Sequence, residues 1–464
     1  MVTAWTTFRF RQAPLALVLV LFFAVLLPAQ ANEFRLATFS ADVTPPLGHP
    51  LMAGGIKPAA KISDPLFARG WVLLGGDKPV VFVAVDWCEI RNDAYDRWRE
   101  ALAQAAETDA TRVMVTAVHV HDAPVADLEA QRILEAHDCV GKICDLQFHE
   151  QAVQRVATAL RKSLSTSQRV THFGVGEAKV EKVASNRRYF LPDGTVTFAR
   201  HSSTKDANAQ AAPEETIDPM LKTLSFWNGG KAVAMVHSYA VHPMSYYGRG
   251  EVSADFVGMA RAKMQADDPS VFQIYSSGCS GNVTAGKYND GSPENRPVLA
   301  ERIFQAMKAS SEKTKRHSLK RVQFRNVSLS LEPRTTAGFT IPELEKVLAD
   351  NTQPFRQCLA AMGLSWHRRV AAGRRIDVPV LDFGKAQLLL LPAESYVEFQ
   401  LFAQQQRPDS FVVTAGYGEC APGYIPIEKA WKEKDRNLND WCWTSPGAEQ
   451  AMKKAVCQAL SKPK

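Results

Sequence analysis

Several features that mark common protein classes are missing from this chain of 464 residues. No apolar run beyond residue 28 is long enough to cross a bilayer, so we expect no transmembrane helix in the mature chain. The sequence has no CxxC pair, which disfavours a thiolate zinc site. It also has no linker-like change of composition, internal repeat or heptad pattern, and we therefore expect one large domain.

The formal net charge is +7, but the basic residues are not distributed along the sequence as nucleic-acid binding requires. Basic residues occur in short groups, such as 313–320 and 368–375, and not in a stripe interleaved with aromatic residues. We therefore expect no nucleic-acid partner and interpret these groups as solvated surface. Transient contact with an anionic membrane surface stays open, as does the oligomeric state.

The amino terminus has the pattern of a secretory signal peptide. Arg9 and Arg11 precede an apolar run from Pro14 to Pro28, and Ala29-Gln-Ala31 supplies a small-x-small cleavage pattern. We predict a signal peptide over residues 1–31, a mature domain over residues 32–464, and a secreted or periplasmic location. The alternative is a retained membrane anchor, for which the apolar run is short.

The eight cysteines are compatible with an exported chain. Oxidising conditions permit disulfides for an even number of cysteines, although spacing does not give their pairing. Cys139 and Cys144 form the most local candidate pair.

Strand patterns alternate with helix patterns along the chain. The expected strands are Phe34–Val43, Phe67–Leu74, Val80–Trp87, Val113–Val120, Leu221–Trp227, Ala232–Val241, Val271–Tyr275, Val322–Leu331, Ala386–Leu391 and Phe411–Ala415. The expected helices are Tyr95–Glu107, His149–Leu164, Phe256–Gln265, Val298–Ser310, Pro342–Ala349, Ser395–Gln406 and Gly447–Leu460. This alternation predicts a single large α/β domain with helices flanking mixed sheets. In such folds functional sites gather beyond the carboxyl ends of strands.

A pair of histidines closes one of these strand patterns. His119 and His121 end the apolar run that begins at Val113. Residues i and i+2 of an extended strand point to one face, so we expect both imidazoles to project together. Converging imidazoles suit a catalytic zinc ion, provided that other ligands arrive from elsewhere and one position stays open for water. Two histidines satisfied by hydrogen bonds are the alternative.

Other polar residues follow further strand patterns. They are Asp86, His242, Glu394 and Tyr424. Glu394 alone could instead cap the helix that follows it. His237 falls on the strand face opposite to His242, and we interpret it as a core histidine.

Together these segments resemble the neutral/alkaline non-lysosomal ceramidase family, especially its shorter bacterial members. The landmarks run through nearly the whole mature chain: Asp42-Val-Thr-Pro, Asp64-Pro-Leu-Phe-Ala-Arg69, Ala117-Val-His-Val-His-Asp122, Asn186-Arg-Arg188, Ala240-Val-His-Pro243, Val252-Ser-Ala-Asp-Phe256, Gly278-Cys-Ser-Gly-Asn-Val-Thr284 and Pro392-Ala-Glu394. The resemblance implies hydrolysis of an N-acyl amide bond, with ceramide or a related N-acyl lipid as the first candidate substrate. Because the chain ends at Lys464, we expect it to lack the immunoglobulin-like carboxyl-terminal domain of full-length members.

The resemblance also implies one Zn²⁺ ion held by two histidines, a glutamate and a tyrosine, with a water molecule completing the site. Carried over by motif, these ligands are His119, His242, Glu394 and Tyr424.

Further roles follow from the same resemblance. His121 corresponds to a histidine beside the metal that transfers protons or holds the substrate carbonyl. Arg187 corresponds to an arginine that faces the polar group of the substrate, with a surface cation as the alternative. We expect Asp86 to orient a ligating imidazole, as carboxylates commonly do.

Two motifs depart from the family pattern. The loop Gly-Asp-Val-Ser-Pro, with its essential serine, is here Gly281-Asn-Val-Thr284-Ala285, in which Thr284 keeps a hydroxyl that could contact the zinc water. The sequence His-Thr-His-Ser becomes His119-Val-His-Asp122, and Asp122 could orient His121 or attract a cationic substrate group. These departures keep a smaller polar amide or ester open as substrate. The alternative to an enzyme is a non-catalytic binding protein of the cell envelope that keeps the fold.

The chemistry follows from these parts. Zinc lowers the pKa of bound water to about 7, and the resulting hydroxide can attack an amide carbonyl. Donors such as His121 or Arg187 would stabilise the oxyanion, and a protonated imidazole could deliver a proton to the departing amine. We therefore expect a zinc-dependent amidohydrolase whose substrate is a small-molecule or lipid amide.

Overall fold

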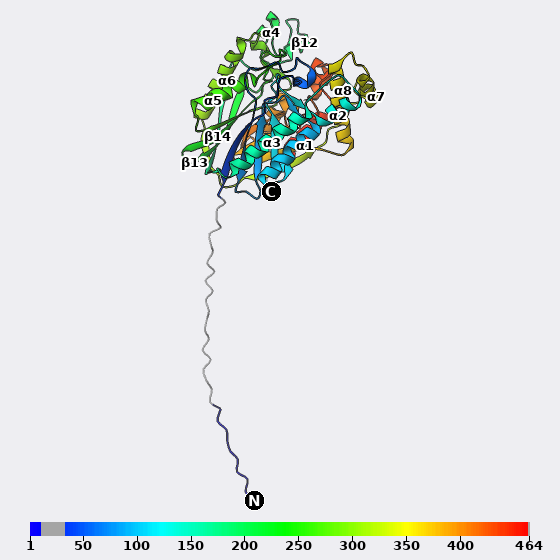
Figure 1. Ribbon diagram of the computed structural model, residues 1–464. Helices are drawn as coiled ribbons and strands as arrows, with labels where there is room; N and C mark the ends of the chain where they lie inside the picture. Colours follow the sequence, from blue (N-terminus) through cyan, green and yellow to red (C-terminus); the bar gives the residue numbers. More distant parts are fainter. Residues whose placement is uncertain (11–32, 463–464) are drawn as a thin grey trace. The chain divides into compact units, whose positions relative to one another are not determined.

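The computed structural model describes residues 1–10 and 33–462. Contacts divide the chain into Met1–Asn32 and Glu33–Lys464, and the described helices and strands belong to the second unit (Figure 1). The apolar run and the cleavage site of the predicted signal peptide lie outside the described residues. Among the residues that are described, none of the helices combines the length and the apolar character that crossing a membrane requires.

The first of three larger sheets within residues 33–462 has the strand order β6-β4-β3-β1-β8. Its strands are β1 (Arg35–Asp42), β3 (Phe67–Leu74), β4 (Val80–Val85), β6 (Val113–Ala117) and β8 (Gln168–Arg169). β4 and β6 are parallel and are joined through α1 (Asn92–Ala106), which packs beside α3 (Leu146–Leu164) (Figure 1). Every side chain of β4 is buried, as expected for a strand with packed layers on both faces.

The second sheet has the order β16-β14-β13-β9-β18. Its strands are β9 (His172–Lys179), β13 (Met220–Asn228), β14 (Lys231–Tyr239), β16 (Phe272–Ser277) and β18 (Lys315–Ser318). β14 and β16 form the parallel pair, and the chain between them contains α5 (Asp255–Asp267). α5 packs against α6 (Asn295–Glu312), and the two helices lie side by side next to β13 and β14 (Figure 1).

The third sheet has the order β19-β20-β21-β23. Its strands are β19 (Gln323–Leu329), β20 (Ile376–Asp382), β21 (Ala386–Leu390) and β23 (Phe411–Ala415). The parallel pair is β21 with β23, joined through α9 (Val397–Gln406), and α11 (Ala448–Ala459) packs on β19, β20 and α9.

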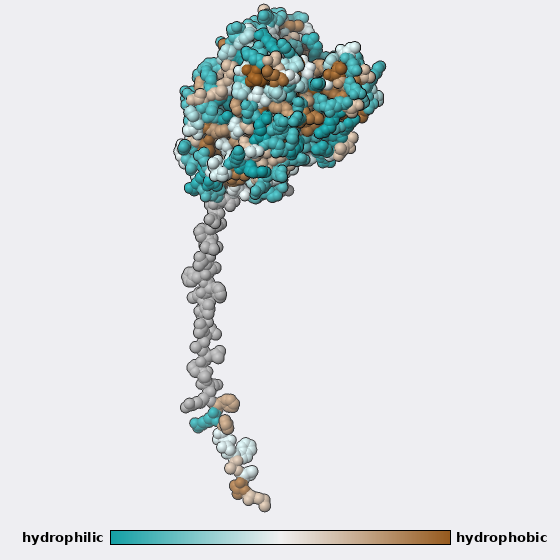
Figure 2. All heavy atoms as spheres, in the orientation of Figure 1, coloured by the Kyte–Doolittle hydropathy of each residue, from teal (hydrophilic) through white to brown (hydrophobic). Residues whose placement is uncertain are grey.

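Short elements complete the unit. The two-stranded pairs are β2 (Lys61–Ile62) with β15 (Glu251–Val252), β5 (Glu89–Ile90) with β7 (Val125–Ala126), β10 (Ser185–Asn186) with β17 (Val283–Thr284), β11 (Tyr189–Phe190) with β12 (Val196–Thr197), and β22 (Glu394–Ser395) with β24 (Tyr424–Ile425). The other helices are α2 (Leu128–Ala136), α4 (Ala207–Ala211), α7 (Ile341–Leu348), α8 (Pro354–Ala371), α10 (Glu428–Lys432) and the 3₁₀ turns η1 (Met52–Gly54), η2 (Ala110–Arg112), η3 (Gly286–Tyr288) and η4 (Arg436–Leu438). Figure 2 shows one face of the unit, on which hydrophilic side chains surround smaller hydrophobic areas.

The carboxyl ends of the three parallel pairs meet. The Ala117 amide donates to the Tyr417 carbonyl at 3.0 Å, and the Gly416 amide donates to the Ser277 carbonyl at 2.8 Å. The Ser277 hydroxyl donates to the Val118 carbonyl at 2.7 Å. Because these bonds join segments that follow β6, β16 and β23, the three sheets present their strand ends to one place.

The predicted α/β class, with mixed sheets and flanking helices, is confirmed. The predicted strand Val113–Val120 is wrong at its end, because β6 stops at Ala117. The sequence patterns also missed β9, which contains Gly174 and Gly176. A side chain on Gly176 would meet the Ser310 carbonyl oxygen at 2.1 Å, so this glycine allows α6 to approach the strand closely.

The cysteines form no local crosslink. All eight are free thiols, and the pair Cys139 and Cys144 is not joined. Cys144 is buried, and its sulfur lies 3.9 Å from the Asp127 carbonyl oxygen.

Candidate metal centre

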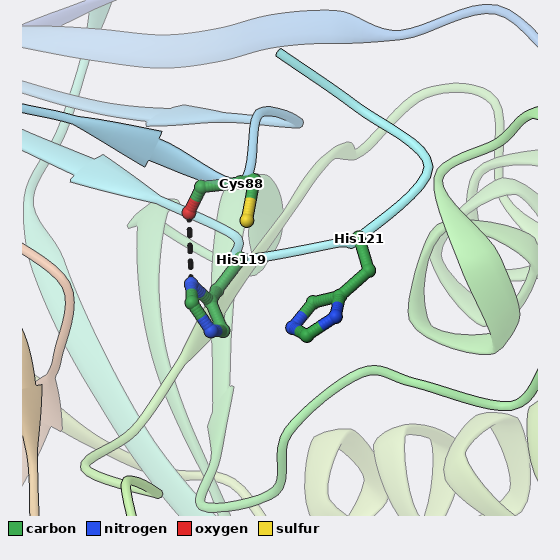
Figure 3. Close-up of side chains that lie close together, drawn as sticks. All are labelled: Cys88, His119 and His121. Atoms are coloured by element: carbon green, nitrogen blue, oxygen red, sulfur yellow. Dashed lines mark hydrogen bonds between the residues drawn. The ribbon is translucent and has the colours of Figure 1, made fainter. Parts of the chain in front are cut away.

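His119 lies in the turn that leaves β6 and not in the strand itself. Its φ of 69° is in the left-handed region, which a residue other than glycine adopts only when the surrounding structure enforces it. The His119 amide donates to the Trp87 carbonyl at 2.9 Å, which ties this turn to the end of β4. The expected convergence with His121 is present, since the ring centroids are 5.1 Å apart (Figure 3). Its cause is the turn and not the alternation of an extended strand.

Backbone carbonyls fix the tautomers of two histidines. Nδ1 of His119 lies 2.8 Å from the Cys88 carbonyl oxygen, a bond drawn in Figure 3, and Nδ1 of His242 lies 2.5 Å from the Ser280 carbonyl oxygen. A carbonyl oxygen only accepts, so each Nδ1 carries the hydrogen and each neutral ring keeps its lone pair on Nε2. This is the orientation that a metal-ligating histidine adopts.

Both lone pairs point at one carboxylate. Oε2 of Glu394 lies 2.9 Å from Nε2 of His242 and 3.4 Å from Nε2 of His119. All three side chains are buried, and Nε2 of His119 has no hydrogen-bond partner. Three acceptors at these distances repel one another unless a proton or a cation lies between them.

The donor set fits a divalent zinc ion. Ligand atoms 2.0–2.1 Å from a tetrahedral zinc ion lie about 3.3 Å apart, close to the separations between Glu394 and the two histidines. The two Nε2 atoms and a Glu394 oxygen all lie within 4.8 Å of one another. His119, His242 and Glu394, predicted from separate segments of the sequence, are therefore brought together in an arrangement that could bind a metal.

The charges of the cluster agree with this reading. Burial alone would raise the pKa of Glu394, but the neighbouring His119 and His242 hold it well below its ordinary value. Burial also lowers the pKa of His242, to about 4. Glu394 is therefore an anion and His242 is neutral at physiological pH, as metal ligands are. Burial opposes a charge on His119, but Glu394 raises the pKa of this ring, which favours a proton on it until a cation replaces it.

A second group, Cys88 with His119 and His121, also lies within 4.8 Å (Figure 3). Burial, followed by the charges of Glu89 and Glu394, raises the pKa of the Cys88 thiol well above its ordinary value. A protonated thiol is a poor ligand, because the thiolate is the form that binds metal. The group with two histidines and a carboxylate is therefore the better candidate.

Tyr424 is placed beside the cluster by strand pairing. β22 and β24 are parallel with Glu394 opposite Tyr424, and the rings of Tyr424 and His242 have centroids 6.4 Å apart. Ala393, just before Glu394, has a φ of 50°, a second left-handed residue at the site. Burial raises the pKa of Tyr424 well above its ordinary value, and the guanidinium of Arg187, whose Nη1 donates to the phenol oxygen at 2.8 Å, opposes that rise.

A cavity of about 370 Å³ adjoins the cluster. Its wall includes His119, His121, Arg187, Glu394 and Tyr424. Both nitrogens of His121 are buried without a hydrogen-bond partner. Its ring packs edge-on against the Tyr247 ring, with the ring centroids 4.8 Å apart. His121 therefore has a donor and an acceptor free for a ligand in the cavity.

Thr284 and Asp122 are not among the residues that line this cavity. The Thr284 hydroxyl donates to the His201 carbonyl at 2.6 Å and accepts from the Gly286 amide at 3.1 Å. Oδ1 of Asp122 accepts from the Gly248 amide at 2.9 Å, and the expected bond to His121 is not formed. Both side chains hold loops next to the site.

The prediction that Asp86 orients an imidazole is wrong. Its carboxylate accepts from Nη1 and Nη2 of Arg261 at 2.6 and 2.8 Å, and from the Phe67 amide at 2.9 Å. The carbonyls of Cys88 and Ser280 orient the two rings instead. The interpretation of His237 agrees with the structure, in which this buried ring is held between Thr223 and Gln273.

Sequence reasoning missed Tyr417. Its ring stacks on His119 with centroids 4.2 Å apart, and its hydroxyl lies 2.7 Å from the Ser280 hydroxyl oxygen. The signal that could have found it is a tyrosine between Gly416 and Gly418 directly after a strand pattern. A side chain on Gly416 would meet the Gly278 carbonyl oxygen at 2.8 Å, so the glycine permits two backbone segments to meet at the site.

The three mixed sheets and their helices form a neutral ceramidase fold. One similar solved structure is the neutral ceramidase from Pseudomonas aeruginosa, with a TM-score of 0.66 and 16% identity over 92% of this chain and 73% of that one. Another is a ceramidase complexed with C2, with the same TM-score and identity over 92% of this chain and 74% of that one. No family model and no curated protein matches the sequence. The resemblance inferred from the motifs is thus confirmed as a likeness of fold.

Proposed function

We propose that the protein is a zinc-dependent hydrolase of N-acyl amide bonds. The observation that carries this proposal is the convergence of two imidazole Nε2 atoms and one carboxylate at the wall of a cavity. The neutral ceramidase fold supports it, because that fold belongs to enzymes named for cleaving an N-acyl bond.

We assign His119, His242, Glu394 and Tyr424 as the zinc ligands. A zinc ion held by these groups would supply a Lewis acid and an activated water molecule at neutral pH. The hydrogen bond from Arg187 to the Tyr424 oxygen stabilises negative charge on that oxygen and so favours its use as a ligand.

His121 is the residue we assign to proton transfer. Its two unpartnered nitrogens border the cavity, so one could take a proton from the attacking water and return it to the departing amine, while the other donates a hydrogen bond to the carbonyl oxygen. Thr284 and Asp122 act from outside the cavity wall in this proposal, through the loops that they hold.

The substrate we propose is an N-acyl lipid, with ceramide as the first candidate. Met52, Met244, Phe355 and Trp441 give the cavity wall an apolar part suited to an acyl chain. The signal-peptide pattern of residues 1–31 supports action outside the cytoplasm, where transient contact with a membrane surface would give access to lipid.

The test combines metal analysis with a substrate panel. We expect the purified protein to contain one zinc ion per chain and to release amine from N-acyl sphingoid bases or N-acylethanolamines. His119→Ala should lose both zinc and hydrolysis while keeping its circular dichroism spectrum, whereas His137→Ala, at an exposed histidine on the end of α2, should keep both. A parent protein that binds no zinc and hydrolyses no amide when zinc is added would overturn the proposal and favour a binding protein.

A further inference from the structure

One part of the cavity wall is strongly basic. Arg187, His201 and Arg436 line it together with Asn437. The acids of the wall are Glu394, which belongs to the metal cluster, and Asp440. Apart from that cluster, the wall therefore has more basic than acidic side chains.

Arg187 is buried with most of its donors unused. The residue is only 5% exposed, and its Nη1 donates to the Tyr424 oxygen at 2.8 Å and to Oδ1 of Asn437 at 3.0 Å. Its Nε is buried without a partner. A guanidinium has five N–H donors in a planar fork, so the free ones call for an acceptor that the surrounding protein does not supply.

Arg436 and His201 extend this basic region toward solvent. Both side chains are exposed, and Arg436 forms no ion pair among the described residues. The neighbouring acid Asp435 is already used, since it accepts from the Tyr396 hydroxyl at 2.7 Å and from the Asn437 amide at 2.9 Å. Partial burial is the largest cause that lowers the pKa of His201, and the charges of Arg187 and Arg436 come next. The three groups therefore lie in one region.

A separate set of residues in the wall is apolar. The rings of Phe355 and Trp441 stack with centroids 6.3 Å apart, and Phe355 and Met52 both pack against Gly55. The indole nitrogen of Trp441 donates to Oε1 of Glu89 at 2.9 Å, which fixes the ring. The cavity wall thus offers apolar side chains for hydrocarbon as well as basic side chains for negative charge.

We propose that Arg187, His201 and Arg436 form a subsite for a carboxylate, so that the preferred substrate is an N-acyl amine that carries a carboxylate, such as an N-acyl amino acid. This inference rests on the proposed hydrolysis of N-acyl amides and narrows the substrate class within N-acyl lipids, from ceramide, which has no carboxylate, to N-acyl amino acids. A carboxylate accepts two parallel N–H bonds from a guanidinium and satisfies the free donors of Arg187. A neutral N-acyl amine leaves the free donors of Arg187 and the charge of Arg436 without an anionic acceptor.

The test compares two substrates that differ in one charge. N-dodecanoylglycine carries the carboxylate, and N-dodecanoylglycinamide is its neutral counterpart with the same chain and amide bond. We expect the parent to show at least a tenfold higher kcat/KM for the acid. In Arg436→Glu the ratio of the two kcat/KM values should fall at least tenfold. Arg161→Glu, with the same change of charge at an exposed position of α3, should keep the parent ratio. A ratio near one in the parent, or the same ratio in Arg436→Glu, would overturn the subsite.

A binding measurement separates this inference from the proposed function. If the parent hydrolyses neither compound, the proposed function fails for this substrate class, and calorimetry still tests the subsite. We expect N-dodecanoylglycine to bind the parent at least tenfold more tightly than the neutral amide, and Arg436→Glu to remove that difference. Equal binding of the two compounds by the parent would refute the subsite whatever the activity.

Discussion

Replacing Glu394 with glutamine should separate metal binding from folding. The amide has the same size as the carboxylate but no negative charge. In the variant, the remaining nearby metal ligands are the imidazoles of His119 and His242, which bring no negative charge. Loss of residues that only orient ligands costs about 10- to 100-fold in metal affinity, so loss of a charged ligand should cost at least about 100-fold, or 2.7 kcal/mol.

The matched control is Tyr417→Phe, which keeps the ring stacked on His119 and removes only the hydroxyl, whose oxygen lies 2.7 Å from the Ser280 hydroxyl and 3.4 Å from Nδ1 of His242. One net hydrogen bond is worth about 0.5–1.5 kcal/mol, so zinc affinity should fall by about tenfold at most. Competition with a chromogenic chelator at pH 7.5 measures both affinities. Circular dichroism checks that each variant is folded.

Thermal and chemical unfolding give an independent measure of the same effect. At a free zinc concentration 1,000 times the dissociation constant, zinc should stabilise the parent by about 4.1 kcal/mol, and a 100-fold weaker Glu394→Gln site should gain only about 1.4 kcal/mol. The gain is measured for each protein against its own stability in chelator, because Glu394→Gln also removes the contacts of the carboxylate with His119 and His242. Zinc affinity of Glu394→Gln within tenfold of the parent, or equal stabilisation by zinc, would refute the assignment of this carboxylate as a ligand.

The remaining predictions concern three neighbouring side chains. Tyr424→Phe should lower zinc affinity at least about tenfold, or 1.4 kcal/mol, and should also cost about 1–3 kcal/mol of stability in chelator, because it removes the acceptor of a buried Arg187 donor; an unaltered zinc affinity would remove Tyr424 from the ligand set. Asp86→Ala leaves the buried guanidinium of Arg261 unpaired and should cost about 3–5 kcal/mol in urea unfolding, yet the folded variant should bind zinc like the parent. Burial raises the pKa of Asp122 to about 6, so its carboxyl favours folding below about pH 4 and loses that contribution as the pH rises through 6. Relative to the parent, Asp122→Asn should therefore become more stable between pH 4 and pH 8, by up to about 3 kcal/mol; a constant difference would contradict the shift.

Much of the fold could be predicted because it depends on local patterns. The buried runs of β4 and β23 and the apolar spacing of α3 are visible in a short window of sequence. β9 was missed because Gly174 and Gly176 interrupt its pattern. Gly176 is required by the close approach of Ser310 in α6, more than a hundred residues away. Such a requirement is set by tertiary packing, which a short window does not contain.

The candidate site likewise has features that the sequence predicted and features that depend on tertiary packing. His119, His242 and Glu394 were named from motifs, and the structure brings them together. The left-handed turn at His119 was not visible, because a positive φ at a histidine is imposed by the packing around it. The role given to Asp86 failed for a related reason: its position at a strand end was read correctly, but its partner Arg261 comes from α5.

The meeting of three strand ends has a mechanical consequence. His119, His242 and Glu394 follow strands of three different sheets, and His242 and Glu394 are 152 residues apart in sequence. A metal ion bound by all three would connect segments that follow three different sheets. In a protein whose cysteines are all unjoined, that single ion would be the cross-link that holds the layers in register.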